Sequence, residues 1–175
     1  MTSSPTTTLT LRPALPADVR AIRSLVEPYA AERILLAKET VAYYEAVQEF
    51  VVADAGDPGA PDVVGCGALH VMWDDLAEIR TLAVDRSWLG RGVGHRLVNE
   101  LLDRARSLGL RRVFCLTFEV DFFRAHGFDA IEGTPVSPDV YAELLRSHDD
   151  GVAEFLDLAR VKPNTLGNTR MLLTL

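Results

Sequence analysis

The sequence has little of several features that would assign a protein to a class at once. Its two cysteines, Cys66 and Cys115, lie in apolar runs without a Cys-x-x-Cys pair or the histidine spacing of a zinc site. We therefore expect buried thiols rather than a disulfide. The four histidines are scattered, so no metal is expected. No run of about 18 apolar residues occurs, which argues against a membrane-spanning helix.

Basic residues are also outnumbered, with 18 Lys and Arg against 25 Asp and Glu and a net charge of −7. This balance argues against non-specific binding to nucleic acid or to an anionic membrane. The N-terminal residues lack the basic and apolar segments of a signal peptide, so a cytoplasmic protein is expected. With 48% apolar residues, the 175-residue chain can form one core. We expect a flexible tail over 1–8 and a single domain over 9–175.

Apolar periodicity predicts an alternation of strands and helices. The expected strands are 8–14, 50–54, 63–72, 77–84, 112–118, 127–131 and 169–175, and the expected helices are 16–30, 39–49, 94–110, 121–126 and 137–147. Pro28 is expected to end the first helix, and Gly109 to cap the one over 94–110. The segment 148–168 shows no clear period. The fold class indicated is mixed α/β (α+β), with helices on both faces of a central sheet.

The stretch "SWLGRGVGHRL", residues 87–97, places three glycines between an apolar strand and a helix. A loop that opens a helix presents backbone N–H groups and the positive end of the helix dipole, which suits a phosphate. Two familiar phosphate loops do not fit. The dinucleotide fingerprint requires a glycine where Leu97 stands, and the P-loop requires Gly-Lys-Ser/Thr, whereas Arg96 is followed by Leu97.

The longer stretch "EIRTLAVDRSWLGRGVGHRLVNELL" resembles the acetyl-CoA motif of the GNAT acetyltransferases, and "DFFRAHGF" resembles their last motif. The resemblance implies the GNAT fold, with a mixed, mostly antiparallel sheet, and acetyl-CoA as co-substrate. Leu89 stands where the family usually has Gln or Arg, and Phe122–Phe123 stand where a Tyr is usual. The residues implied in binding the cofactor are Leu82, Ala83, Val84, Leu89, Gly90, Arg91, Gly92, Val93, Gly94 and His95.

Within that family the order of "VVGCGALHV", "EIRTLAV", "GVGHRLV", "RVFCLTF" and "FFRAHGF" is similar to the acetyltransferase domain of N-acetylglutamate synthases. The resemblance implies transfer of acetyl to the α-amine of L-glutamate, the first step of arginine biosynthesis. It matches the short form without an amino-acid-kinase domain. L-Glutamine remains a second candidate acceptor, and a homodimer remains open.

The catalytic residues implied by the resemblance are Glu78 as general base and Thr117 as the hydroxyl that assists the leaving thiol. The residues alone favour another interpretation of Glu78, as a surface carboxylate paired with Arg80. Thr117 could be a strand threonine bonded to backbone, and His126 and Tyr141 are weaker rivals for the acid. A backbone N–H in 82–84 is expected to polarise the thioester carbonyl.

Glutamate carries two carboxylates, so its pocket needs cations with directional donors. The candidates are Lys38, Arg80 and Arg170, each of which could instead be an ordinary solvated charge. Lysine occurs only at positions 38 and 162, which makes Lys38 the more distinctive. Two other functions stay open: a GNAT enzyme with another acceptor, such as another amino acid, a polyamine or a protein N-terminus, and a non-catalytic acyl-CoA-binding regulatory module.

Overall fold

A computed structural model describes residues 8–175, so the expected tail over 1–8 lies almost wholly outside the described residues. The described strands form one sheet in the order β1-β2-β3-β4-β5-β7-β6. Strand β4 pairs with β5 in parallel, and the pairs β1–β2, β2–β3, β5–β7 and β6–β7 are antiparallel. Their bounds are β1 (Thr10–Pro13), β2 (Phe50–Asp54), β3 (Val63–Val71), β4 (Leu76–Val84), β5 (Arg112–Thr117), β6 (Asp129–Ala130) and β7 (Thr169–Thr174).

The predicted helices are present, with different ends in places. The α-helices are α1 (Val19–Ala31), α2 (Thr40–Glu45), α3 (Val93–Ser107), α4 (Val120–Arg124), α5 (Pro138–Leu144), α6 (Asp150–Phe155) and α7 (Lys162–Thr165). The unassigned segment 148–168 therefore contains two short helices. Ser137 caps α5, since its side chain accepts a hydrogen bond from the Val140 N–H. Gly109 follows α3 with a φ of 76°, as expected of a C-terminal glycine.

The prediction that Pro28 ends the first helix is wrong, because α1 continues to Ala31. Proline removes one N–H donor and crowds the preceding turn, which is most disruptive in a helix interior. Pro28 lies in the last turn of α1, and its carbonyl still accepts a hydrogen bond from the Glu32 N–H at 3.2 Å. The missing N–H group of Pro28 therefore costs α1 little stability, because the helix ends three residues later.

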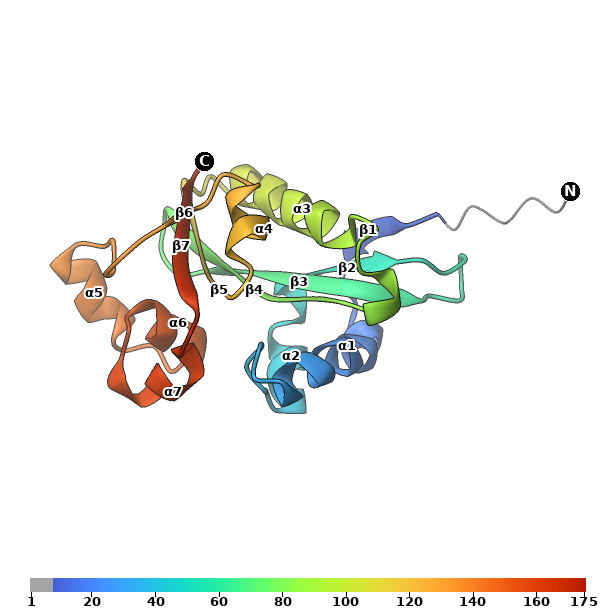
Figure 1. Ribbon diagram of the computed structural model, residues 1–175, viewed down its shortest axis with the longest axis horizontal. Helices are drawn as coiled ribbons and strands as arrows, with labels where there is room; N and C mark the ends of the chain where they lie inside the picture. Colours follow the sequence, from blue (N-terminus) through green and yellow to red (C-terminus); the bar gives the residue numbers. More distant parts are fainter. Residues whose placement is uncertain (1–7) are drawn as a thin grey trace, which may run out of the picture. The chain divides into compact units, whose positions relative to one another are not determined.

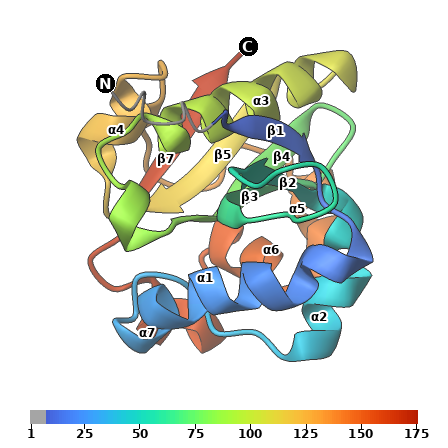
Figure 2. The same ribbon diagram turned by 90° about the vertical axis from the view of Figure 1, so that its right-hand side faces the viewer.

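Contacts divide the described residues into two compact units, one of residues 8–68 and 81–101 and the other of 69–80 and 102–175. The first unit holds β1, β2, α1 and α2, with parts of β3, β4 and α3. Alternate residues of β3 serve opposite faces, as the two-residue period of a strand requires. Gly65 lies under Val93 and Leu97 of α3, whereas Cys66 packs in the cluster with α1. Figure 2 shows α3 and α1 on opposite sides of β3.

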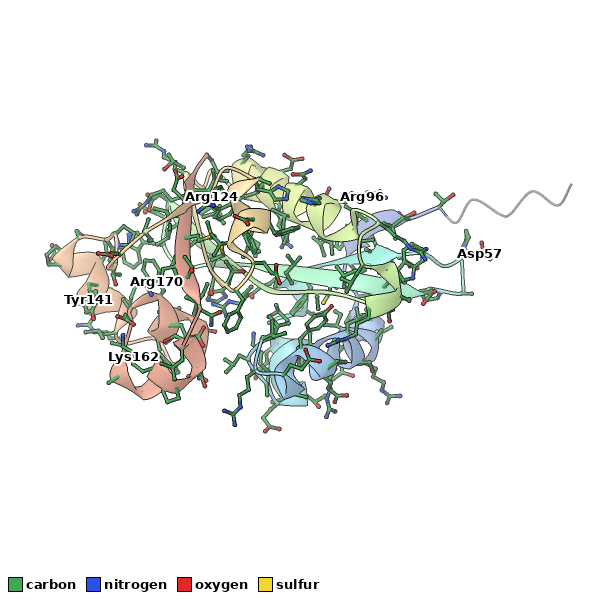
Figure 3. The ribbon with its side chains drawn as sticks, viewed as in Figure 1. Asp57, Arg96, Arg124, Tyr141, Lys162 and Arg170 are labelled. Atoms are coloured by element: carbon green, nitrogen blue, oxygen red, sulfur yellow. The ribbon has the colours of Figure 1, made fainter. Side chains whose placement is uncertain are left out.

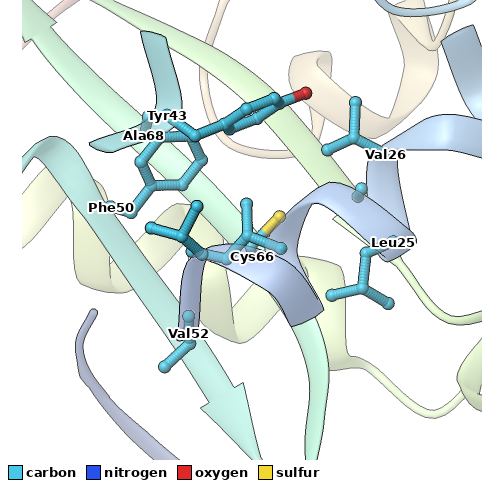
Figure 4. Close-up of a cluster of buried hydrophobic side chains, with 10 residues drawn as sticks. Leu25, Val26, Tyr43, Phe50, Val52, Cys66 and Ala68 are labelled. Atoms are coloured by element: carbon cyan, nitrogen blue, oxygen red, sulfur yellow. The ribbon is translucent and has the colours of Figure 1, made fainter. Parts of the chain in front are cut away.

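The apolar cluster on the α1 side of this unit draws on α1, α2, β2 and β3. Figure 4 shows its centre, where Phe50 and Val52 of β2 lie with Tyr43 of α2 and Cys66 of β3. The Tyr43 and Phe50 ring centroids are 6.3 Å apart. Burial of this cluster removes apolar surface from water at about 25 cal/mol per Å², which fixes α1 and α2 against the strands.

The second unit holds β5, β6 and β7, with helices α4 to α7 and one part each of β3 and β4. Figure 1 shows β7 beside β6, in agreement with their antiparallel pairing. Phe114 of β5 and Phe155 of α6 are fully buried, and their rings meet edge to face at 5.0 Å. The two rings fix α6 on this part of the sheet. Within residues 8–175 no helix is long and apolar enough to cross a membrane.

Candidate active site

The glycine loop of the first unit runs from the end of β4 to the start of α3. Asp85 opens it by accepting a hydrogen bond from the Ser87 N–H at 2.8 Å, and the short helix Arg86–Trp88 follows. Gly90 and Gly92 then have φ angles of 74° and 78°, a region that side chains rarely enter. A Cβ atom at either position would meet no protein atom within 4 Å. The sharp turn, rather than crowding by the protein, requires these two glycines.

The end of this loop is the N-terminus of a 15-residue helix, since α3 begins at Val93. The first four N–H groups of a helix have no partner within it, and the helix dipole adds positive charge there. Gly94 lies inside the first turn and does not share the positive φ of Gly90 and Gly92. Arg91 stacks over the Trp88 ring at 4.9 Å, and His95 is exposed on the same turn. This arrangement suits an anion that the backbone can approach closely.

The strand that leads into the loop contains an irregular residue. Thr81 has a φ of 55°, which is unusual for a β-branched residue and interrupts the pleat of β4. Leu82, Ala83 and Val84 follow it, and the Val84 carbonyl accepts a hydrogen bond from Tyr29 Oη at 2.6 Å. Lys38 Nζ lies 3.5 Å from Thr81 Oγ1, which places this predicted substrate residue beside β4.

A partly buried ion-pair network lies in the second unit. Glu78 of β4 is only 3% exposed, and its Oε2 accepts a hydrogen bond from Arg80 Nε at 2.9 Å. Arg80 Nη1 and Nη2 each donate to one oxygen of Asp149, both at 2.9 Å. The guanidinium is thus shared between two carboxylates. Glu78 is paired with Arg80, as the alternative interpretation held, but it is buried and not a surface residue.

The charge on Arg80 keeps Asp149 ionised. Burial alone would raise the pKa of Asp149, but the hydrogen bonds and charge of Arg80 outweigh it, and the pKa falls to about 2. Nearby, burial and the charge of Glu78 raise the pKa of the Cys115 thiol on β5. That thiol is therefore protonated and is no nucleophile at neutral pH.

Two further predicted residues also lie in the second unit. Thr117 at the end of β5 is buried, and its Oγ1 accepts a hydrogen bond from the Glu119 N–H at 2.8 Å. Figure 3 labels the side chain of Arg170 on β7. Its terminal nitrogens donate hydrogen bonds to the carbonyls of Gly133, Glu154 and Phe155. These bonds tie the segments around 133 and 154–155 to β7.

Sequence reasoning missed Asp149. The string "DDGV" at 149–152 carries a helix N-cap signal, and Asp149 does cap α6 by accepting a hydrogen bond from the Val152 N–H. No local pattern could reveal its pairing with Arg80, because 69 residues separate the two. Across the described part of the chain, no group of three or more His, Cys, Asp or Glu residues is arranged to hold a metal ion.

The family is decided by comparison with known proteins. The family model described as "Acetyltransferase (GNAT) family" matches residues 19–128. The chain belongs to the GNAT acetyltransferase family. This acetyltransferase is 59% identical over 165 residues to an "Amino-acid acetyltransferase" of Mycobacterium tuberculosis, and the match covers 94% of each chain.

Solved structures agree with this assignment. A crystal structure of a Mycobacterium tuberculosis protein in complex with CoA and NLQ has 59% identity and a TM-score of 0.91, and the match covers 95% of this chain and 99% of that one. N-acetylglutamate synthase from Neisseria gonorrhoeae, complexed with coenzyme A and N-acetyl-glutamate, has 22% identity and a TM-score of 0.73. The match covers 96% of this chain and 35% of that one, and at this identity it shows the fold alone.

The predictions of a GNAT fold, of an acyltransferase and of similarity to amino-acid acetyltransferases of the N-acetylglutamate synthase type are confirmed. The assignments of individual residues stay predictions, as does the single domain over 9–175.

Proposed function

We propose that this acetyltransferase moves the acetyl group of acetyl-CoA to the α-amine of L-glutamate, with Glu78 as the general base. The observation that carries the proposal is the buried Glu78 carboxylate, held by Arg80 on the strand that leads into the glycine loop. The 59% identity to an amino-acid acetyltransferase supports the class of acceptor.

The glycine loop would bind the pyrophosphate of acetyl-CoA through backbone N–H groups of residues 89–95. The positive φ angles of Gly90 and Gly92, the open space in front of them and the N-terminus of α3 support this. A relative with 59% identity has been solved with CoA bound. Since these contacts come from the backbone, Leu89 can replace the usual Gln or Arg of the family.

The reaction requires the substrate ammonium to lose a proton before its nitrogen attacks the thioester carbonyl carbon. Glu78 accepts that proton, directly or through one water. A backbone N–H within 82–84 stabilises the negative charge that develops on the carbonyl oxygen. The nitrogen then loses its second proton as the C–S bond breaks, and the thiolate of coenzyme A takes up a proton, so that the amide and the free thiol are formed. An ordinary thiol has a pKa near about 8.5, so acid help from Thr117 is useful but not essential.

The cations proposed for the acceptor do not have equal support. Lys38 is a half-buried residue whose Nζ lies 3.5 Å from Thr81 Oγ1, which favours it as a ligand of a carboxylate. Arg170 uses both terminal nitrogens on backbone carbonyls, which favours a structural role. Arg80 is bonded to two carboxylates of the protein, which favours a role in holding Glu78. Direct contact of either arginine with the acceptor stays a prediction.

The acceptor is tested by release of thiol from acetyl-CoA in the presence of each of the twenty amino acids. We expect glutamate to be a substrate with modest discrimination against glutamine. A mismatched hydrogen bond to the side-chain amide costs about 1–3 kcal/mol, or five- to about 150-fold in kcat/KM. Glutamate α-amide should be inactive, because a free α-carboxylate is required. An active α-amide would replace the proposal with a broader amine acetyltransferase.

The absence of thiol release with every amine would instead favour the acyl-CoA-binding regulatory module. Binding of acetyl-CoA measured by calorimetry on the same protein separates this outcome from a misfolded sample. A protein that binds acetyl-CoA and releases no thiol has a working cofactor-binding loop but does not catalyse acetyl transfer.

A further inference from the structure

The network around Glu78 contains one more carboxylate than cation. Glu78 and Asp149 are both negative, and Arg80 is their shared guanidinium, with donor–acceptor distances of 2.9 Å throughout. When all three are ionised, the cluster has a net charge of −1. A buried pair of one carboxylate and one guanidinium would be neutral and a poor proton acceptor. The charge of Asp149 therefore makes the cluster a better proton acceptor than the Glu78–Arg80 pair alone.

We propose that Asp149 is a positioning residue that holds Arg80 by both terminal nitrogens and thereby keeps Glu78 competent to accept a proton. The inference rests on the proposed role of Glu78. Asp149 does not touch the reacting atoms; it acts through Arg80.

The geometry of the two pairs supports unequal roles. Asp149 takes the two terminal nitrogens end-on, in the bidentate arrangement that fixes the plane of a guanidinium. Glu78 contacts the side of the same group through Nε and Nη2. Asp149 is the more exposed of the two, with 32% of its side chain accessible against 4% for Glu78. The outer carboxylate thus anchors the arginine, and the inner one is held at a fixed position.

The segment that carries Asp149 is shaped to fit this network. Gly151 lies in α6, although glycine in a helix costs about 1 kcal/mol relative to alanine. A Cβ there would lie 2.7 Å from Arg80 Nη2 and 2.8 Å from Glu78 Oε2. The first turn of α6 therefore lies directly on the ion pair, with no room for a methyl group. The Val152 N–H donates a hydrogen bond of 2.9 Å to Asp149 Oδ1, and this N-cap bond fixes the position of the turn.

Other charged and titratable groups face the network from the neighbouring strands and from α6. The substitution D149N leaves these residues themselves unchanged. They are His70 of β3, which acts on Asp149, Cys115 of β5 and Arg170 of β7, which face Glu78, and the buried Glu154 of α6.

The test is the pH dependence of kcat/KM for glutamate in the variant D149N. Asparagine is as good an N-cap as aspartate, so α6 keeps its cap and loses only the charge. Without the second carboxylate, Arg80 neutralises Glu78 fully, and removal of a nearby like charge lowers the pKa of an acid. We expect the acidic limb to move down by about one pH unit and kcat to fall about tenfold.

The matched control is D150N, one residue further along the same helix. Asp150 pairs with Arg160 at the surface, where both side chains are half exposed, so this variant removes the same charge outside the network. Its acidic limb should coincide with that of the unmodified protein. If D149N does not fold, as judged by circular dichroism, D149S retains a capping oxygen and is read in the same way.

The results for E78Q and D149N distinguish a failure of the role of Asp149 from a failure of the role of Glu78. If E78Q retains the acidic limb, Glu78 is not the base and the proposed function of that residue fails. If E78Q loses the limb but D149N leaves it in place, Asp149 is only a structural residue and this inference alone is overturned. A limb that moves to higher pH in D149N would also overturn it, because Arg80 would then have left Glu78.

Discussion

The glycine loop and the Glu78–Arg80–Asp149 network differ in the groups that form them and in their exposure to solvent. The loop is exposed, consists of backbone, and takes its shape from closely spaced residues with positive φ angles at Gly90 and Gly92. The network is partly buried, consists of side chains, and joins residues that lie 69 positions apart. A backbone site tolerates changes of side chain but not of φ, whereas a side-chain site depends on charge and on accurate placement.

This difference predicts that the two regions fail in different ways, and the largest effect is expected at Glu78. The variant E78Q keeps the shape and removes the proton acceptor, so turnover should fall about 10²–10⁴-fold. The affinity for acetyl-CoA, measured by calorimetry, should remain within about twofold because the loop is intact. Turnover that stays at the level of the unmodified protein across the acidic limb would show that water or substrate self-ionisation supplies the base.

A substitution in the glycine loop should weaken the binding of acetyl-CoA rather than lower turnover. In G92V the positive φ is no longer accessible without strain of about 1–2 kcal/mol, and relaxation of the loop misplaces its N–H groups. We expect the Kd for acetyl-CoA to rise at least about tenfold, or roughly 1.4 kcal/mol.

The matched control for G92V is G59V. Gly59 has a φ of 88°, and a Cβ atom at this position would also meet no protein atom within 4 Å, but the residue lies in the turn before β3. Both variants should lose similar stability on heating, and only G92V should lose affinity. Equal affinities in folded G92V and in the unmodified protein would remove residues 89–95 from the cofactor site.

A third variant tests whether the network is as tightly packed as its distances indicate. Gly151→Ala places a methyl group where the Arg80 and Glu78 side chains meet, so the pair must shift. A displacement of under about 1 Å should lower kcat about tenfold without a change in acetyl-CoA affinity. A normal kcat would mean that the position of Glu78 is not critical.

The smallest expected effect concerns stability in acid. The folded pKa of Asp149 lies near 2, below the ordinary value of 3.8, so its pairing stabilises the protein fully above about pH 4. This contribution, on the order of 2 kcal/mol, is lost as the pH falls from about 4 to about 2. Urea unfolding of D149N should therefore differ from the unmodified protein at about pH 6 and converge with it towards about pH 2. A constant difference across this range would contradict the assigned pairing.

Each region could be predicted from the sequence only to the extent that its structure depends on residues adjacent in the chain. The loop could be found because Gly90, Gly92 and the start of α3 are adjacent in the chain, and φ preference is a local property. The end of α1 was misjudged because Pro28 falls in a last turn that tolerates proline. The second partner of Arg80, Asp149, could not be found, because this pairing depends on how the segment 148–168 folds back onto β4. The left-handed Thr81 also has no local signal, since threonine ordinarily favours an extended strand.

The two glycines of β3 give the cofactor loop a dependence on residues that no ligand would touch. A Cβ at Gly65 would lie 3.0 Å from side-chain atoms of Val93 and Leu97, and one at Gly67 would lie 2.9 Å from Leu101. A methyl group at either position would press on these side chains, which would have to move by a few tenths of an ångström. The packing of α3 on β3, and with it the position of the turn that opens α3, therefore depends on the absence of a side chain at Gly65 and Gly67.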